Sequence, residues 1–164
     1  MAMENRKDYE ELIQFPSELD TRLWVAFNRV QQAVHRSMDS EMKKRGLPSV
    51  KWYDVLWSLE RIGGEGLRAF ELEHIALFEQ SNLSRLLARM VREGFIEEFR
   101  CPSDGRGKIY QITDKGKDLR LEMWQVYGPL IQKQMSHFAN LIPAEEVIEG
   151  LYSMVGDSVY RNDK

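Results

Sequence analysis

The feature that most constrains the fold is a helical segment from Ser81 to Gly94, followed by two short strand-like segments. Its apolar residues recur every three or four positions, which predicts a helix with one buried side: Leu83, Leu86, Leu87, Met90 and Val91. Ser81 is a favourable N-cap, and Gly94 can adopt the left-handed conformation that ends a helix. Residues 96–100 and 108–113 predict the strands of a hairpin. A capped helix, a hairpin and a further helix predict, in this order, a winged helix-turn-helix.

The outer face of the same helix carries Arg85, Arg89 and Arg92, at positions i, i+4 and i+7. A solvated basic face would show the same pattern, so the distribution of charge along the chain decides between the two interpretations. The whole chain has a net charge of −3, yet residues 81–120 hold nine basic and six acidic residues. This segment therefore carries +3 and the remainder −6. We expect an acidic body with one basic surface that binds double-stranded DNA.

Long helices are predicted on both sides of this region. Ser17 precedes a stripe that ends before Gly46 and Pro48, and its members are Leu19, Leu23, Phe27, Val30, Val34, Met38 and Met42. Thr113 begins a second long helix, in which Gly128-Pro129 predicts a kink or a break. A final helix after Pro143 has an apolar face of Val147, Ile148, Leu151, Met154 and Val155. Helices of this length exceed one small core, which favours a homodimer.

The expected fold class is mainly α with a small β wing. An N-terminal arm covers residues 1–16, and dimerisation helices cover residues 17–48 and 114–164. The winged helix-turn-helix DNA-binding domain covers residues 49–113. Within it, a helix over 49–62 has an inner face of Trp52, Val55, Leu56, Leu59 and Ile62, Leu67 makes a strand contact, and a short helix covers 69–77.

Side chains that reach base edges are expected on the exposed side of the predicted recognition helix, at Asn82, Ser84, Arg85 and Arg89. Arginine pairs with guanine, asparagine with adenine, and serine with either. The residues expected to contact DNA are Ser81, Asn82, Ser84, Arg85, Arg89, Arg92, Arg106 and Lys108. Arg106 lies between two glycines in the predicted turn 101–108 and is expected to enter the minor groove. Asp104 is expected to structure this turn, and a hairpin tip without a partner is the alternative.

These residues resemble the MarR (multiple-antibiotic-resistance regulator) family of winged helix-turn-helix transcription factors. The matching segments are Ser84-Arg85-Leu86, Arg89-Met90, Gly94, Asp104-Gly105-Arg106 and Ile112-Thr113-Asp114-Lys115-Gly116. The resemblance covers most of residues 17–156, and Ile112 stands where leucine is usual. It implies a homodimer that binds a pseudo-palindromic operator, usually to repress transcription, with recognition helices about 34 Å apart along the duplex.

The resemblance also implies that a small aromatic effector releases the DNA. Aromatic surface for such a ligand is offered by Trp24, Phe27, Trp52, Tyr53 and Trp57. Packing in the core or in a dimer interface is the alternative, and it is favoured for most of them. A winged-helix module that binds an acidic protein partner through the same basic surface is the alternative to DNA binding.

Cys101 is the single cysteine, which excludes an intramolecular disulfide. A redox-responsive regulator through Cys101 is an alternative, with Arg100 as the neighbouring cation, but an incidental thiol is favoured. His35, His74 and His137 lack the spacing of metal ligands, and no phosphate-binding loop or catalytic motif is present, so neither an enzyme nor a metal or cofactor is expected. No apolar run approaches the ~18 residues of a membrane span, and a cytoplasmic protein is expected.

Overall fold

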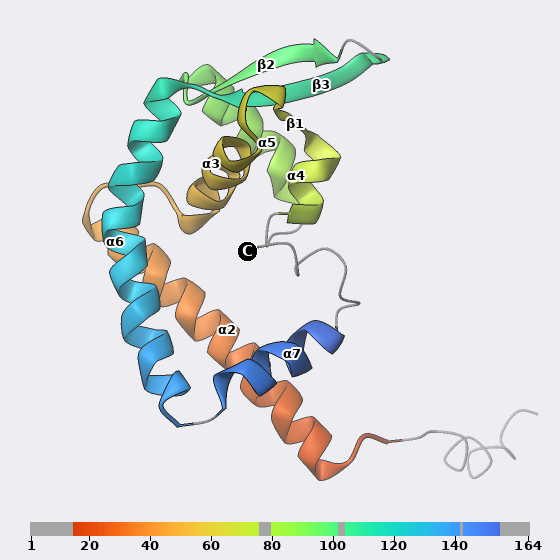
Figure 1. The fold of residues 1–164 in the computed structure, drawn as a ribbon, viewed down its shortest axis with the longest axis vertical. Coiled ribbons are helices and arrows are strands. Elements are labelled where there is room, and N and C mark those ends of the chain that lie inside the picture. The colour runs from red at the N-terminus through yellow and green to blue at the C-terminus, as the bar shows by residue number, and fades with distance from the viewer. Residues whose placement is uncertain (1–14, 76–79, 102–103, 142, 155–164) are drawn as a thin grey trace, which may run out of the picture. The chain divides into compact units, whose positions relative to one another are not determined.

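The computed structural model describes residues 15–75, 80–101, 104–141 and 143–154 (Figure 1). The chain divides into two compact units, Met1–Ser37 and Met38–Lys164. The elements in chain order are α2 (Glu18–Lys44), α3 (Val50–Ile62), a short 3₁₀ helix (Gly63–Glu65), β1 (Leu67–Arg68), α4 (Ala69–Ile75), α5 (Gln80–Arg92), β2 (Ile96–Cys101), β3 (Asp104–Ile112), α6 (Asp114–Ala139) and α7 (Ala144–Met154). This arrangement confirms the predicted class of a mainly helical fold with a small β wing. Most of the predicted N-terminal arm, residues 1–14, lies outside the described residues.

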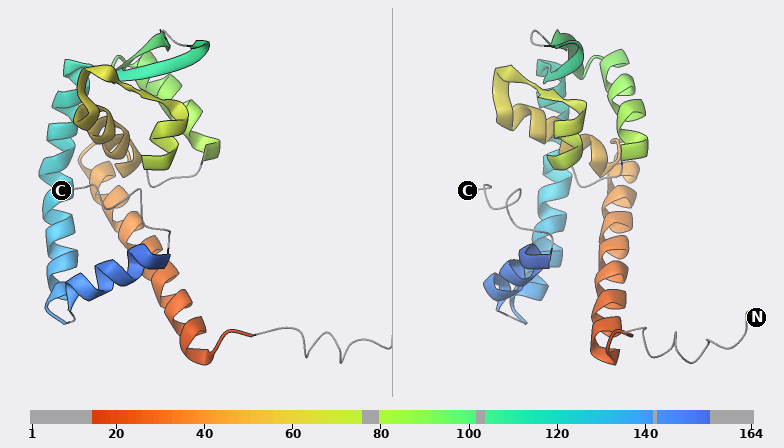
Figure 2. Two further views of the ribbon diagram at one scale, coloured as in Figure 1. Left: turned by 45° about the vertical axis from the view of Figure 1, so that its right-hand side comes forward. Right: turned by 90° about the vertical axis from the view of Figure 1, so that its right-hand side faces the viewer.

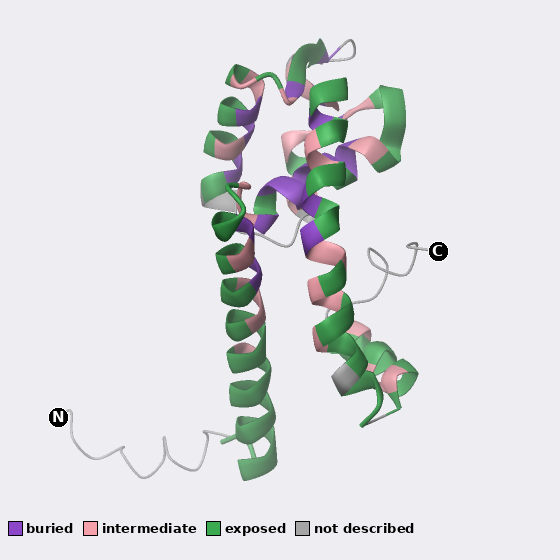
Figure 3. Ribbon diagram, turned by 90° about the vertical axis from the view of Figure 1, so that its left-hand side faces the viewer, coloured by how far each residue is buried: buried purple, intermediate pink, exposed green. Residues whose placement is uncertain are grey.

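Helix α2 begins and ends where its capping residues predict. The Asp20 backbone N–H donates to Ser17 Oγ at 3.1 Å, and the Ser17 backbone N–H donates back to Asp20 Oδ2 at 3.0 Å. At the other end Gly46 has φ 72°, and the Leu47 N–H donates to the Met42 carbonyl at 3.0 Å. Met38 and Met42 are buried in the second unit, whereas the apolar residues of α2 in the first unit are mostly exposed (Figure 3).

The core of the second unit is built around α3. Its buried residues are Val50, Trp52, Tyr53, Val55, Leu56, Ser58 and Leu59, and they pack with Leu72, Leu83, Leu87, Met90, Ile96 and Met123. Ile62 was expected on this inner face but is 41% exposed, because it is the last residue of the helix. Tyr53 is buried because its ring stacks on Trp124 of α6 at 5.6 Å and meets Tyr127 edge-on at 5.0 Å.

The sheet has the strand order β1-β3-β2, with both pairs antiparallel. The predicted strand contact of Leu67 is confirmed, since Leu67 pairs with Tyr110. Gly66 precedes this strand with φ 70°, and a side chain there would lie 2.6 Å from the Tyr110 carbonyl oxygen, so only glycine fits. The base of the hairpin is thereby held against the end of α3.

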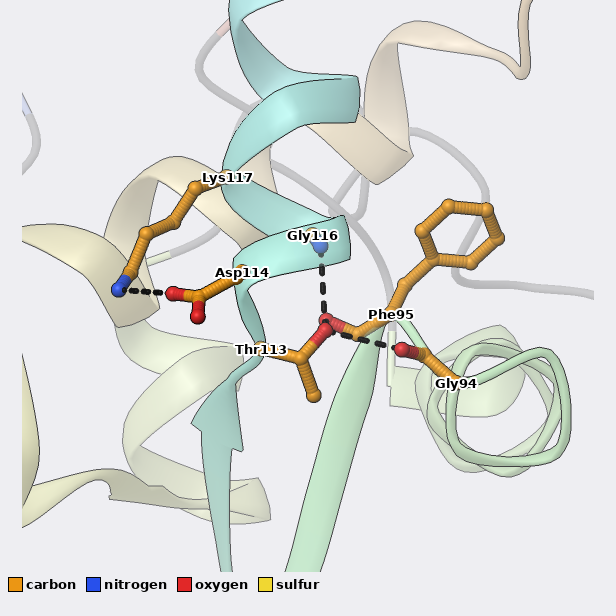
Figure 4. A network of polar contacts seen from close by, with 6 residues as sticks. All are labelled: Gly94, Phe95, Thr113, Asp114, Gly116 and Lys117. Carbon is orange, nitrogen blue, oxygen red and sulfur yellow. Dashed lines mark hydrogen bonds and ion pairs between the residues drawn. The ribbon is translucent and has the colours of Figure 1, made fainter.

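Thr113 joins the hairpin to α6 (Figure 4). Its hydroxyl donates to the carbonyl of Gly94 at 2.9 Å and accepts from the Gly116 backbone N–H at 3.1 Å. Its own backbone N–H donates to the Phe95 carbonyl at 3.2 Å. One threonine therefore caps α6 and binds the chain segment that ends α5, as the N-cap prediction for Thr113 requires.

Helix α6 continues through Gly128-Pro129 to Ala139, so of the two predicted outcomes the break is wrong, while the kink stays a prediction. The helix tolerates proline here because Val126 is buried and Tyr127 is half-buried against α3 immediately before it. Figure 2 shows from two further sides that α6 starts at the base of the hairpin and leads away from it to α7. In α7 the residues Ile148, Leu151 and Met154 are exposed. Within the described ranges, no helix is long and apolar enough to cross a membrane.

Asp54 of α3 is a half-buried carboxylate that faces a second one. Burial raises the pKa of Asp54 to about 7, and the charge of Asp39 acts in the same direction. Asp39 accepts a hydrogen bond from the Val50 backbone N–H at 2.9 Å, which holds it at the start of α3. Burial also raises the pKa of Tyr127 to about 12, and the charge of Asp54 adds to that rise. Burial thus raises the pKa of both Asp54 and Tyr127, and the exposed Asp39 acts on each of them through its charge.

Replacing Gly116 by alanine tests the junction at Thr113. A side chain at Gly116 would collide with the Phe95 carbonyl oxygen and come within 2.8 Å of Ile112 Cγ1. We expect the Gly116→Ala variant to lose about 1–3 kcal/mol of unfolding free energy. Gly150→Ala is the matched control, because nothing lies within 4 Å of its added Cβ and the position is helical. The control should gain about 0.5–1 kcal/mol, and equal effects of the two variants in urea unfolding would contradict the packing argument.

Replacing Asp54 by asparagine tests the buried carboxylate. Because the folded-state pKa of about 7 lies above the ordinary 3.8, the unfolded chain releases its proton first as the pH rises. The contribution of Asp54 to stability is therefore complete below about pH 4 and is lost as the pH rises through about 7, a loss on the order of 2–4 kcal/mol. Urea unfolding at fixed protein concentration measures this loss. The unfolding free energy of the Asp54→Asn variant should exceed that of the native protein by more at about pH 8 than at about pH 5.

Asp118→Asn, an exposed change on α6, is the control for the pH experiment. Its effect on the unfolding free energy should be small and the same at both pH values. A difference between the native protein and the Asp54→Asn variant that does not change with pH would show that Asp54 titrates as an ordinary exposed carboxylate.

Candidate nucleic-acid interface

Helix α5 presents one polar side to solvent because its other side is locked into the core. Leu83, Leu87 and Met90 are at most 3% exposed, whereas Asn82, Ser84 and Arg85 are exposed. The helix begins at Gln80, one residue before the predicted cap. Ser81 therefore has helical backbone and is not the N-cap, which corrects the capping prediction. The side chains of Gln80 and Ser81 lie outside the described residues.

Gly94 ends α5 as predicted. It has φ 75°, and its N–H donates to the Val91 carbonyl at 3.0 Å. The following Phe95 N–H donates to the Met90 carbonyl at 3.0 Å, which completes the hydrogen-bond pattern typical of a left-handed helix end. The chain then turns directly into β2, so the recognition helix and the hairpin are joined by a short, fully bonded connection.

The three arginines of the predicted row differ in their surroundings. Arg85 is exposed, and within the described part of the chain it forms no hydrogen bond or ion pair. Arg89 Nε donates to Glu93 Oε1 at 2.7 Å, and its guanidinium lies 5.2 Å from the centre of the Trp52 ring. Arg92 is 3.9 Å from the same Glu93 oxygen. The i, i+4 spacing of Arg89 and Glu93 is the sequence signal for this pair.

The hairpin is longer than the sequence predicts. Residues 101–108 were expected to form its turn, but Cys101 belongs to β2 and Asp104 to Lys108 belong to β3. Pairing passes from Arg100 opposite Lys108 directly to Cys101 opposite Asp104, so Gly105, Arg106 and Gly107 form an irregularity in β3. The error arose because glycine is common both in turns and in bulges. The side chains of Asp104 and Arg106 lie outside the described residues.

Lys108 on β3 is exposed and paired across the hairpin with Glu98, whose Oε2 is 2.9 Å from Lys108 Nζ. The hydrogen bond and charge of Glu98 raise the pKa of Lys108. The lysine stays cationic, but its charge is partly neutralised by this neighbour. Glu98 was not among the residues that the sequence singled out, because cross-strand neighbours depend on the register of the hairpin.

Cys101 is buried at the point where the pairing becomes irregular. The cation beside it is Arg68 of β1, whose guanidinium lies 2.7 Å from Cys101 Sγ, and not the sequence neighbour Arg100. Arg68 also lies 6.0 Å from the Phe70 ring. Burial favours the interpretation of Cys101 as a structural thiol, because reactive cysteines are usually accessible.

The five aromatic residues considered for an effector have different environments. Trp52 and Tyr53 are 3% and 6% exposed and pack in the core of the second unit. Trp57 is on the exposed side of α3, with Arg61 lying 5.0 Å from its ring centre. Trp24 and Phe27 are exposed residues of the first unit. Of the five, Trp52 and Tyr53 therefore fit the interpretation as packing in the core. Among the described residues, no group of three or more potential metal ligands is found.

Comparisons with known proteins agree with this geometry. Residues 45–107 match the model of the MarR family. A transcriptional repressor of the helix-turn-helix type, IacR from Pseudomonas putida, is 28% identical over 110 residues, which are 67% of this chain and 63% of that protein. The chain thus spans less than two thirds of the length of this relative.

Solved structures resemble the fold of this chain over most of its length. Sco3205, a MarR family transcriptional regulator from Streptomyces coelicolor in complex with DNA, has a TM-score of 0.73 at 20% identity, covering 92% of this chain and 97% of that one. The organohalide-sensing regulator RdhR-CbdbA1625, in its 2,4-dichlorophenol-bound form, has a TM-score of 0.70 at 20% identity, covering 93% and 92%. The family-model match thus lies over the helix-turn-helix and the wing, and the chain shares the winged helix-turn-helix fold of these MarR family structures.

Proposed function

We propose that this chain is a sequence-specific DNA-binding transcriptional regulator that acts as a homodimer on a pseudo-palindromic operator, as a repressor. The observation that carries the proposal is α5, whose apolar side is buried while Asn82, Ser84 and Arg85 are exposed beside a hairpin wing. The DNA-bound structure of a family member and the repressor from Pseudomonas putida support it. Helix α5 would enter the major groove.

The roles of the DNA-facing residues follow from their chemistry. Arg85 would pair with guanine, Asn82 with adenine, and Ser84 with either base. Ser81, Arg92 and Lys108 would contact the phosphate backbone, and Arg106 would reach the minor groove from the wing with Asp104 supporting it. Because Lys108 is paired with Glu98, it would contribute less to the attraction of phosphate than an unpaired lysine.

A DNA-binding titration tests the proposal. The native protein should bind a duplex selected from a random-sequence pool with an affinity that falls steeply with salt. Arg85→Ala should weaken binding and lose roughly 5- to 100-fold of discrimination at one base position, since a bidentate arginine–guanine contact contributes about 1–3 kcal/mol. Lys133→Ala removes one exposed charge from α6 and is the control that should leave base discrimination intact. Unchanged discrimination by Arg85→Ala would contradict the assigned contact.

Failure of the native protein to bind any duplex at low salt would favour the alternative, a winged-helix module that binds an acidic protein. The proposal includes release by a small aromatic effector, supported by the dichlorophenol-bound relative. Adding 2,4-dichlorophenol to the same titration should then raise the dissociation constant, and an unchanged constant argues against phenols of this type. A redox-responsive regulator through Cys101 remains an alternative mode of control, in which peroxide would replace the phenol in that titration.

Exposed apolar residues support the proposed homodimer. In the first unit they are Leu19, Leu23, Trp24, Phe27 and Val30, and near the C-terminus they are Met135, Phe138, Leu141, Ile148, Leu151 and Met154. Soluble monomers rarely expose so many large apolar side chains on neighbouring turns. A second copy of the chain would cover these surfaces, as the prediction from the long helical stripes requires.

Light scattering at micromolar concentration should give twice the chain mass of 19.3 kDa. Leu23→Asp combined with Phe27→Asp should shift the protein toward the monomer, because charges would enter an apolar interface. Gln31→Asp with Gln32→Asp adds the same charge at exposed polar positions of α2 and should leave the mass unchanged. A monomeric mass for the native protein would contradict the homodimer.

A further inference from the structure

Arg89 takes part in a row of contacts that joins the recognition helix to three other segments. Its Nε donates to Glu93 Oε1 at 2.7 Å, and its guanidinium lies 5.2 Å from the centre of the Trp52 ring on α3. Trp52 meets the Phe95 ring edge-on, with centres 5.5 Å apart. Lys115 of α6 places Nζ 4.3 Å from the Phe95 ring centre and donates to the Glu93 carbonyl at 2.7 Å. Two aromatic rings in edge-on contact thus lie between two cations at the end of α5.

Trp52 cannot move with the Arg89 side chain if that side chain turns outward toward DNA. Trp52 is only 3% exposed and is fixed by the core around α3. To reach a base edge, the Arg89 guanidinium would have to leave the face of that ring and break its hydrogen bond to Glu93. Both interactions favour the position that Arg89 already has, since a cation over tryptophan and an i, i+4 ion pair are each stabilising. Arg85, one turn earlier, has no comparable contact among the described residues.

We propose that Arg89 is a positioning residue, which holds the end of α5 against α3 and α6, and that it does not read a base. The inference rests on the proposed DNA-binding function and assigns the choice of bases to Asn82, Ser84 and Arg85. Glu93 holds the Arg89 guanidinium in place, and the contact of that guanidinium with Trp52 of α3 fixes the C-terminal end of α5. Base-edge contacts are therefore confined to the N-terminal half of the recognition helix.

A substitution of Glu93 distinguishes the positioning role of Arg89 from a base-reading role. Glu93→Gln removes a negative charge beside the DNA-binding surface, so electrostatics alone would tighten DNA binding. If Glu93 instead holds Arg89 in its positioning contact, the same change loosens α5 and weakens binding. The two roles of Arg89 therefore predict opposite signs for one conservative substitution.

Hydrogen exchange in the DNA-free protein tests the positioning role independently of DNA binding. The backbone amides of Glu93, Gly94 and Phe95 should exchange faster in Arg89→Ala, because the last turn of α5 loses its side-chain anchor. Arg89→Lys, which keeps a cation near both Trp52 and Glu93, should restore most of the protection. Lys133→Ala, which removes an exposed cation from α6, is the control and should exchange like the native protein. Unchanged exchange in Arg89→Ala would overturn the proposal.

Binding to the selected duplex and to its single-base variants gives the second test. Arg89→Ala should weaken binding to all of them by the same factor, about three- to tenfold, while the order of base preference stays that of the native protein. Arg89→Lys should recover the affinity, and Glu93→Gln should weaken it. Loss of discrimination at one position in Arg89→Ala, or tighter binding by Glu93→Gln, would overturn the proposal. If the native protein binds no duplex, the proposed function fails, while the exchange result still decides the role of Arg89.

Discussion

The hydrogen bonds of Thr113 are the constraint on which the winged helix-turn-helix depends. Its hydroxyl binds the carbonyl of Gly94 and caps the Gly116 N–H, while its backbone N–H binds Phe95. The end of α5, the base of the hairpin and the start of α6 therefore meet at one residue. Buried Gly116 permits this close approach, because a side chain there would collide with the Phe95 carbonyl. A rigid junction is what a recognition helix needs, since its side chains must reach base edges with little freedom.

The cations of the basic surface differ in the contacts that hold them, and this difference matters more than the number of charges. Glu93 and Trp52 engage Arg89, and Glu98 engages Lys108, whereas Arg85 is left to solvent. Exposed ion pairs of this kind contribute little to stability, so their main effect is on where each cation is held. Asp54 is half-buried on α3 of the same unit, where burial raises the pKa of its carboxyl to about 7. The acidic remainder of the chain thus includes one carboxylate whose charge depends on pH.

Much of the fold was predictable from local patterns. Ser17 and Thr113 begin their helices, Gly46 and Gly94 end theirs, and the leucines of α5 are buried, because capping and helical periodicity depend on neighbouring residues only. The hairpin of the wing was predicted, but its strands were predicted too short. Gly105 and Gly107 were assigned to a turn because glycine is common both in turns and in bulges. Of the kink or break predicted at Pro129, the break was wrong because packing of α6 on α3 outweighs one missing hydrogen bond. The dimer surfaces and the DNA contacts stay predictions.

The order of the elements, the buried side of each helix and the polar residues on the exposed side of α5 could be read from the amino-acid pattern. These properties follow from spacing along one chain, at periods that a helix or strand imposes. Which arginine is held and which is left to solvent depends on how separate elements pack. Trp52 reaches Arg89 across 37 positions and Arg68 reaches Cys101 across 33, and such pairs form only when separate elements pack. Side chains of one type acquire different roles because their neighbours come from distant parts of the chain.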